Sequence, residues 1–287
     1  MNSEEQDQAI SAASEAVANA DTLIITAGAG MGVDSGLPDF RGTDGFWNAY
    51  PHAKKLGLSF PDLANPQWFT EDPELAWGFY GHRAHLYADA TPHDGFKILK
   101  KWSEQRPFRP FVFTSNVDGH FQQVGFEDVW ECHGSILFAQ CSKPCCHDIW
   151  PLSSHMVPEI DMDSFRAIHP LPTCPHCDSI SRPNVLMFGD YGWLGNRQED
   201  QQHNFNRWNN QLVQEFDLDV RVTIIEMGAG TAIPTVRYFS EMKRSAFHGT
   251  LIRINPREPE ISDGEGISIR SGALEALKAI DAKLVSG

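Results

Sequence analysis

The feature that most constrains this chain is an apolar run that leads into closely spaced glycines. Residues 23–25 are Leu-Ile-Ile, and Gly28, Gly30 and Gly32 follow. This pattern predicts a strand and a tight turn, because glycine adopts positive φ and lets other groups approach its backbone. In an α/β domain such a turn offers the N–H groups of the next helix to a pyrophosphate. The stretch therefore predicts a dinucleotide site, although glycines in such turns also serve steric needs alone.

Further apolar runs alternate with stretches of helical periodicity. Strands are predicted at residues 111–114, 222–227, 250–255 and 267–269, and helices at 4–20, 66–90, 203–218 and 273–284. This alternation predicts an α/β fold, with a parallel sheet between helices. Residues 43–60 contain Gly45, Pro51 and Gly57 and are predicted to be irregular.

Polar or small residues follow several of the predicted strands. Ser115, Asn116 and Asp118 come after the strand at 111–114, and the turn at 228–230 comes after the strand at 222–227. Ligands bind at the carboxyl ends of strands in parallel sheets. An amide and a carboxylate there suit a carboxamide or a ribose. His133 precedes a glycine, which leaves its imidazole room to reach a ligand, but a single histidine is more often structural.

Five of the six cysteines lie within residues 141–177. Two pairs, Cys141 with Cys145 and Cys174 with Cys177, suit a structural Zn²⁺ held by four thiolates. Cys146 is an alternative to Cys145, and His147 and His176 are possible substitutes. Buried free thiols or a redox pair would also explain the cluster. The prolines and polar residues of 151–172 predict a loop inside this zinc module.

The formal net charge of −15 argues against nucleic acid as the main partner, because a phosphate backbone requires a basic surface. The charge suits a cationic protein substrate, and it also serves solubility. No apolar run is long enough for a membrane span. The acidic N-terminus does not resemble a signal peptide, so a cytoplasmic protein is expected.

Several segments together resemble the sirtuins, the NAD-dependent protein deacylases. They are the stretch from Gly28-Ala29-Gly30 to Asp39-Phe40-Arg41-Gly42, Asn116-x-Asp118, His133-Gly134, the two cysteine pairs, Arg182-Pro183-Asn184-Val185 with Phe188-Gly189, and Ile254-Asn255. The order of the segments matches the family over nearly the whole chain. The resemblance implies a Rossmann-like NAD-binding domain (1–42, 92–138 and 184–287) with a smaller inserted module. This module would comprise a helical part (43–91) and a zinc part (139–183).

The resemblance also implies roles for individual residues. His133 would be the general base, acting with Asn116 and Asp118. The NAD site would be formed by Gly28, Ala29, Gly30, Asp39, Phe40, Arg41, Ser115, Asn116, Asp118, His133, Gly228, Ala229, Gly230 and Asn255. Met187, Phe188 and Gly189 would bind the backbone of an acyl-lysine protein substrate by strand addition. The products would be the deacylated lysine, nicotinamide and O-acyl-ADP-ribose.

Tyr80 and Arg83 are spaced to share one helix face. By spacing alone, an arginine stacked on a core tyrosine explains the pair. By resemblance, the pair matches the Tyr-x-x-Arg of the desuccinylase and demalonylase branch, in which both residues bind the acyl carboxylate.

Three positions depart from the family pattern. Ser115 replaces a glutamine, the turn at 228–230 lacks the hydroxyls of Gly-Thr-Ser, and Met31-Gly32 stands where a hydroxyl residue is common. These departures keep a mono-ADP-ribosyltransferase or NAD glycohydrolase as an alternative. A binding module without turnover is a third hypothesis, which the presence of Asn116, Asp118 and His133 disfavours. The sequence leaves the oligomeric state unknown.

Overall fold

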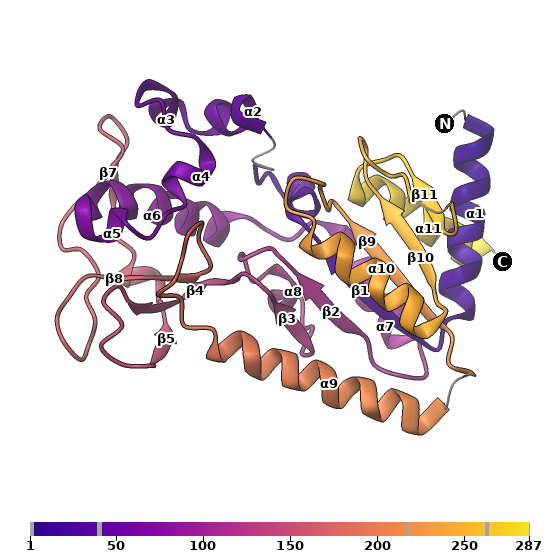
Figure 1. Ribbon diagram of the computed structural model, residues 1–287. Coiled ribbons are helices and arrows are strands. Elements are labelled where there is room, and N and C mark those ends of the chain that lie inside the picture. The colour runs from indigo at the N-terminus through magenta and orange to yellow at the C-terminus, as the bar shows by residue number, and fades with distance from the viewer. Residues whose placement is uncertain (1–2, 39–41, 217–218, 262–263, 287) are drawn as a thin grey trace.

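The computed structural model describes residues 3–38, 42–216, 219–261 and 264–286. Figure 1 shows a larger part, in which helices surround a parallel sheet, and a smaller part of short helices and antiparallel strands. No helix in the described ranges is both long and apolar enough to cross a membrane.

The larger part is built on a six-stranded parallel sheet with the strand order β11-β10-β9-β1-β2-β3. The strands are β1 (Thr22–Ala27), β2 (Phe111–Thr114), β3 (Val129–Glu131), β9 (Val222–Met227), β10 (Thr250–Ile254) and β11 (Ile267–Ile269). Every residue of β1, β2 and β9 is buried, as is typical of parallel strands covered on both faces. The predicted α/β fold and the predicted strands are confirmed.

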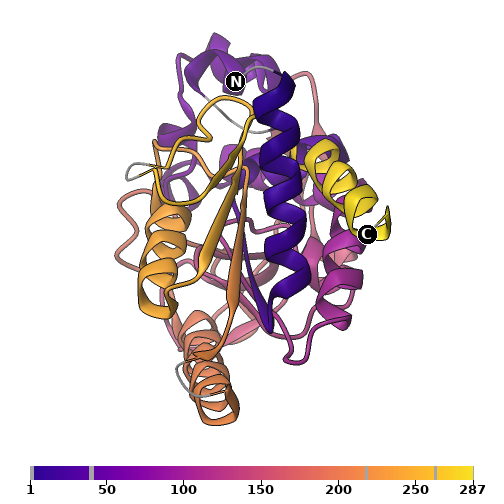
Figure 2. The same cartoon turned by 90° about the vertical axis from the view of Figure 1, so that its right-hand side faces the viewer.

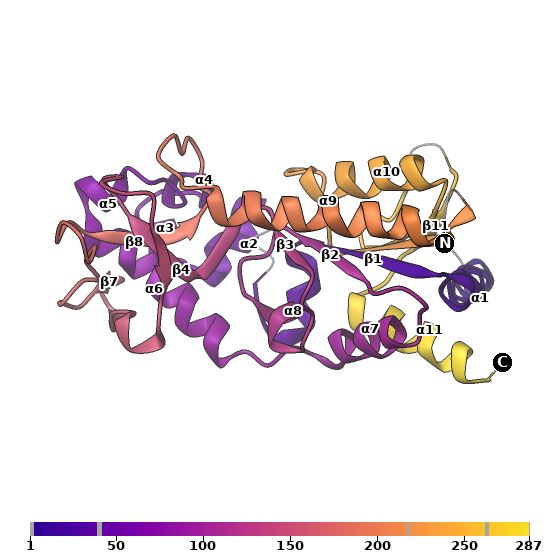
Figure 3. The same ribbon diagram turned by 90° about the horizontal axis from the view of Figure 1, so that it is seen from below.

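Helices cover both faces of this sheet, as Figures 2 and 3 show from two directions. One layer contains α1 (Ser3–Asn19), α7 (Asp94–Glu104) and α11 (Ala273–Ser286), and the other contains α9 (Asn196–Phe216) and α10 (Thr235–Phe247). In β1, Ile25 packs in the core on the α1 side, and Ile24 packs on the α9 side. Alternate residues of one strand therefore join two separate cores.

The smaller part begins with a series of short helices and one longer helix. Three of them, α2 (Gly42–Ala49), α3 (Pro51–Lys55) and α4 (Phe60–Leu63), lie in or next to residues 43–60, which the sequence predicted to be irregular. The next two, α5 (Trp68–Glu71) and α6 (Pro73–Asp89), lie within the stretch 66–90 that was predicted to be helical. The prediction for 43–60 was wrong because the proline and glycine that were taken to break helices lie at the ends of helices. Pro51 starts α3, and Gly57, with φ of 69°, lies just beyond that helix. Phe46 and Tyr50 pack against Phe79 of α6, which gives these short helices a core.

A three-stranded antiparallel sheet joins the two parts. It consists of β5 (Ile149–Pro151), β4 (Gly134–Cys141) and β8 (Ser181–Val185). β4 and β8 approach closely at Gly134, where a Cβ would lie 2.1 Å from the carbonyl oxygen of Asn184. The region predicted as a loop within 151–172 also holds the short η2 (Ser154–Met156), β6 (Ile160–Asp161) and β7 (Arg166–Ala167).

Two glycine turns meet at the carboxyl ends of β1 and β9. The turn after β1 continues into η1 (Ala29–Ser35), a 3₁₀ segment rather than the expected α-helix. The amide of Gly28 donates to Met227 O at 3.0 Å, and that of Gly30 donates to Gly228 O at 3.1 Å. These two amides therefore bind protein carbonyls, whereas the glycine pattern predicted that the amides of this turn bind a phosphate.

Gly228 is required at this contact for two reasons. Its φ is 60°, and a Cβ there would lie 2.5 Å from Gly30 Cα and 2.3 Å from Met31 N. Positive φ costs a residue with a side chain about 1–2 kcal/mol. The overlap adds a further penalty, because the neighbouring atoms belong to the backbone and cannot rotate away.

We expect Gly228→Ala to lower the free energy of unfolding by about 4 kcal/mol or more, in the range reserved for severe packing defects. Gly57→Ala is the matched control, because Gly57 has φ of 69° and no neighbouring atom within 4 Å of the place that a Cβ would take. It should cost only about 1–2 kcal/mol. Urea unfolding measures both, and equal losses would show that the overlap at Gly228 is relieved.

Candidate active site

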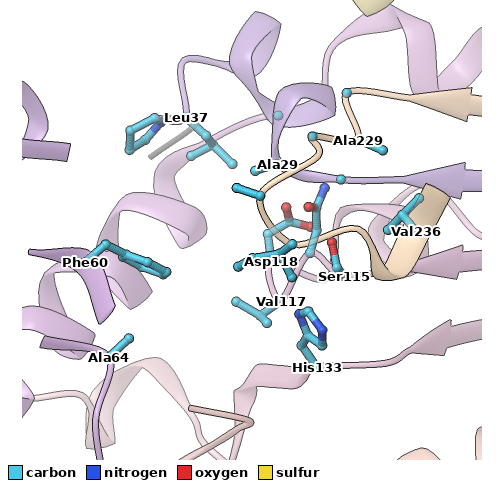
Figure 4. A pocket seen from close by; sticks show the side chains of 18 of the residues that line it. Ala29, Leu37, Phe60, Ala64, Ser115, Val117, Asp118, His133, Ala229 and Val236 are labelled. Carbon is cyan, nitrogen blue, oxygen red and sulfur yellow. The ribbon is translucent and has the colours of Figure 1, made fainter. Parts of the chain in front are cut away.

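A cavity of about 660 Å³ lies between the sheet and the smaller part. Figure 4 shows His133, Ser115 and Asp118 on its wall, with Phe60 and Leu37 across from them. The lining also includes Gly28, Ala29, Asn116, Tyr80, Arg83, Met187, Phe188, Gly228, Ala229, Gly230, Thr231, Arg257 and Glu258. The volume falls within the range of about 300–1,000 Å³ that is usual for ligand pockets.

His133 lies immediately before β4. Its backbone oxygen accepts a hydrogen bond of 3.0 Å from the amide of Leu186, which fixes the main chain at the cavity wall. Burial lowers the pKa of His133 below its ordinary value of 6.5. Burial thus favours the neutral imidazole, which is the form that accepts a proton.

The loop after β2 places the polar residues that the sequence singled out. The Thr114 hydroxyl donates to Ala27 O at 3.0 Å and accepts from the amide of Asn116 at 3.0 Å, so the loop is tied to β1. Asp118 Oδ1 accepts from the amide of His120 at 2.9 Å. Burial raises the pKa of Asp118, while nearby His120 and Arg83 oppose that rise. Both Asn116 and Asp118 line the cavity.

The turn at 228–230 forms the other end of the cavity. A Cβ at Gly230 would meet only Glu258 Oε2, at 3.9 Å, so this wall is open backbone. Arg237 of α10 donates to Ala229 O at 3.2 Å and holds the turn from below. Glu258 accepts from the Thr231 hydroxyl at 2.7 Å. Thr231 and Glu258 were not predicted, because only their spatial position brings them to the cavity.

Asn255 takes a different place from the one that the resemblance implied. It is fully buried and is not among the residues that line the cavity. Its side-chain nitrogen donates to Ala229 O at 2.8 Å, and its oxygen accepts from the amides of Arg257 and Glu258. Asn255 therefore shapes the turn from behind. Asp39, Phe40 and Arg41 lie outside the described residues.

At the opposite end, Tyr80, Arg83 and Tyr87 of α6 line the cavity. Arg83 donates from Nε and Nη2 to the Tyr87 hydroxyl, at 3.1 and 2.8 Å. The guanidinium also lies over the rings of Phe60, Phe79, Tyr80 and Tyr87, 5.4 to 5.8 Å from their centroids. The buried Tyr80 hydroxyl has no hydrogen-bond partner among the described residues. Sequence reasoning missed Tyr87, although its i+4 spacing from Arg83 was visible.

The segment after β8 contributes Met187 and Phe188 to the lining, whereas Gly189 is not part of it. The amide of Met187 donates to Asp190 Oδ2 at 3.3 Å, and that of Phe188 donates to Ala64 O at 2.9 Å. Both amides are thus engaged within the protein. A substrate strand would have to pair with other groups of this segment.

Four cysteine thiols come together in the smaller part. The sulfur atoms of Cys141, Cys145, Cys174 and Cys177 all lie within 4.8 Å of one another. Cys141 and Cys177 are 3.7 Å apart, and Cys145 and Cys174 are 3.6 Å apart. Four sulfurs placed tetrahedrally about 2.3 Å from Zn²⁺ lie about 3.8 Å apart. The set fits a structural zinc ion, and it contains Cys145 rather than Cys146.

Curated relatives match this chain over different lengths. An NAD-dependent protein deacylase of Aquifex aeolicus is 34% identical over 168 residues, which are 58% of this chain and 62% of that protein. A protein with the same name from Aeropyrum pernix is 29% identical over 262 residues, which are 90% of this chain and 91% of that protein. The match thus spans less than two thirds of the Aquifex protein and nearly all of the Aeropyrum protein.

Two solved structures share the fold over almost the whole chain. A Sir2 homologue in complex with NAD has a TM-score of 0.69 and 26% identity, covering 96% of this chain and 94% of that one. An ADP-ribose complex of a mutant Sir2 homologue has a TM-score of 0.69 and 25% identity, covering 100% of this chain and 97% of that one.

The model of the Sir2 family matches residues 28–213. This range begins at the first glycine turn and includes His133, the cavity loop after β2 and all four clustered cysteines. It covers well over half of the sequence, and the fold agrees with it. The chain belongs to the Sir2 family.

Proposed function

We propose that this protein is an NAD-dependent protein-lysine deacylase. The observation that carries the proposal is one cavity that joins a neutral, partly buried histidine to an open glycine turn on one side and to the Tyr80–Arg83 pair on the other. The names of its relatives, and the NAD and ADP-ribose bound in related structures, support this reading over ADP-ribosyl transfer or NAD hydrolysis.

The residues present fit NAD. Gly228 and Gly230 leave bare backbone at the cavity wall, where a larger residue would place a side chain. Ser115, Asn116 and Asp118 offer polar groups deeper in the cavity. When bound, NAD supplies an ADP-ribosyl group, whose bond to nicotinamide is exchanged for one to the acyl oxygen of lysine.

The chain's own residues would orient and protect this reaction. Asp118 would accept a hydrogen bond from a carboxamide, in a position fixed by the amide of His120. His133 would accept a proton at an imidazole nitrogen and later return it, which is the task of a general base. Phe60 and Leu37 would limit the access of bulk water, whereas one water molecule is consumed when the acyl–lysine amide bond breaks and the acyl group passes to the ribose. The products would be the deacylated lysine, nicotinamide and O-acyl-ADP-ribose.

Incubation with NAD and matched acetyl-, succinyl- and long-chain acyl-lysine peptides should yield O-acyl-ADP-ribose, detected by mass spectrometry. His133→Ala should slow its formation by about 10²–10⁴-fold, the usual contribution of a general base. Free ADP-ribose or a modified protein, with every peptide unchanged, would favour the glycohydrolase or transferase instead.

The pH response of His133 should follow from its burial. Burial disfavours the charged ring, so its protonation midpoint should lie below 6.5, and the neutral base should persist above that midpoint. NMR of labelled histidine side chains would measure the midpoint, and His133→Gln would identify the signal. A midpoint at or above 6.5 would contradict this assignment.

We further propose that Tyr80 and Arg83 bind a negatively charged acyl group, such as succinyl or malonyl. A buried guanidinium held by a hydroxyl, beside an unpartnered tyrosine hydroxyl, suits a carboxylate. Tyr87 would position Arg83. The net charge of −15 suits a lysine-rich substrate segment.

Arg83→Met should therefore reduce kcat/KM for succinyl-lysine by about 10- to 100-fold more than for acetyl-lysine, because a charged hydrogen bond contributes about 1.5–3 kcal/mol. Tyr87→Phe is the matched variant, since it keeps the charge of Arg83 but removes the hydroxyl to which Arg83 donates. Its loss of kcat/KM for succinyl-lysine relative to acetyl-lysine should be smaller than that of Arg83→Met. An equal loss on both peptides would exclude the carboxylate role.

A further inference from the structure

A second group of metal-ligating side chains lies beside the four-cysteine site. Its members are Cys146, Asp148 and His176, whose ligand atoms all lie within 4.8 Å of one another. They come from two segments that are distant in sequence, and the four-thiolate site uses none of them. Cys146 is half-buried, whereas Asp148 and His176 are exposed.

The four-cysteine site holds the backbone of both segments. Cys146 directly follows Cys145, and their sulfur atoms are 3.8 Å apart. His176 lies between Cys174 and Cys177, and its amide donates to Cys174 Sγ at 3.5 Å. Zinc in the first site would therefore order the second set in advance, which reduces the entropy that a second ion must overcome.

His176 Nε2 lies 2.8 Å from Asp148 Oδ2. An exposed histidine–carboxylate contact accounts for this pair alone, and such contacts contribute little stability. It does not account for the thiol of Cys146, which joins the same group. Thiolate, imidazole and carboxylate are the three side-chain ligand types that Zn²⁺ takes in proteins.

Charge also favours a second cation at this place. Four thiolates around one Zn²⁺ carry a net charge of about −2. A thiolate from Cys146 and a carboxylate from Asp148 would add two further negative charges close by. A second divalent cation would neutralise this concentration of charge, because opposite charges attract strongly at short range.

We propose that Cys146, Asp148 and His176 bind a second zinc-type divalent cation next to the four-cysteine site. Three protein ligands leave one position of a tetrahedral ion for water or an external ligand. This site would differ from its neighbour in keeping an open coordination position, through which its metal can exchange.

The metal content of the whole 287-residue chain tests the proposal. The metal-free protein is titrated with Zn²⁺ in competition with a chromophoric chelator, and bound metal is then quantified by mass spectrometry. The wild-type chain should bind two equivalents, and Cys146→Ser and His176→Ala should each bind one. His147→Ala is the matched control, because His147 lies in the same loop but outside the group, and it should still bind two.

Co²⁺ provides a second readout that does not depend on activity or on folding of a variant. The first equivalent should produce the strong near-ultraviolet absorption of four thiolates, and the second should add about a quarter as much, since one thiolate binds it. A single equivalent in the wild-type chain, or an equal metal content in wild type and His176→Ala, would overturn the proposal.

Discussion

The contact between the two glycine turns is the constraint on which the rest of the structure depends. Gly228 approaches Gly30 so closely that no side chain fits between them, and the amide of Gly30 donates to Gly228 O. Because these turns end β1 and β9, the contact fixes the carboxyl edge at the centre of the sheet. Asn255 and Arg237 reinforce it by binding Ala229 O from behind. At Gly228 the cavity wall is bare backbone, because the close approach to Gly30 and Met31 leaves no room for a side chain.

The second wall of the cavity depends on the smaller part. β4 starts one residue after His133 and ends at Cys141, so a single strand connects the proposed base to a zinc ligand. β8 pairs with β4 and continues into Met187 and Phe188 at the cavity. Zinc would hold the distant ends of both strands, and the close approach at Gly134 holds the near ends. The metal would thus help to position the cavity wall through these two strands, without contact with the cavity itself.

The sequence predicted the features that short-range patterns encode. Strands, the glycine turns and the cysteine pairs depend on residues that are near one another in the chain, and all of them recur in the structure. Spatial partners were harder to predict. The bond from Asn255 to Ala229 O joins residues 26 positions apart, and those from the amides of Gly28 and Gly30 to Met227 O and Gly228 O join residues about 200 positions apart. No short-range pattern reveals such partners, and the roles of these residues toward a cofactor stay predictions. The short helices of 42–63 were missed because tertiary packing stabilises them, rather than periodicity.

The two ends of the cavity are linked by charge. Burial raises the pKa of Asp118, and the positive charge of Arg83 opposes this rise. Arg83 is itself buried among aromatic rings, whose faces attract its charge. An acyl carboxylate bound to Arg83 would cancel part of the attraction that Asp118 feels. The pKa of Asp118 would then rise further than with a neutral acyl group, which leaves the charge of Arg83 uncompensated. The charge of the acyl group would thereby change the pKa of Asp118 without direct contact between the two.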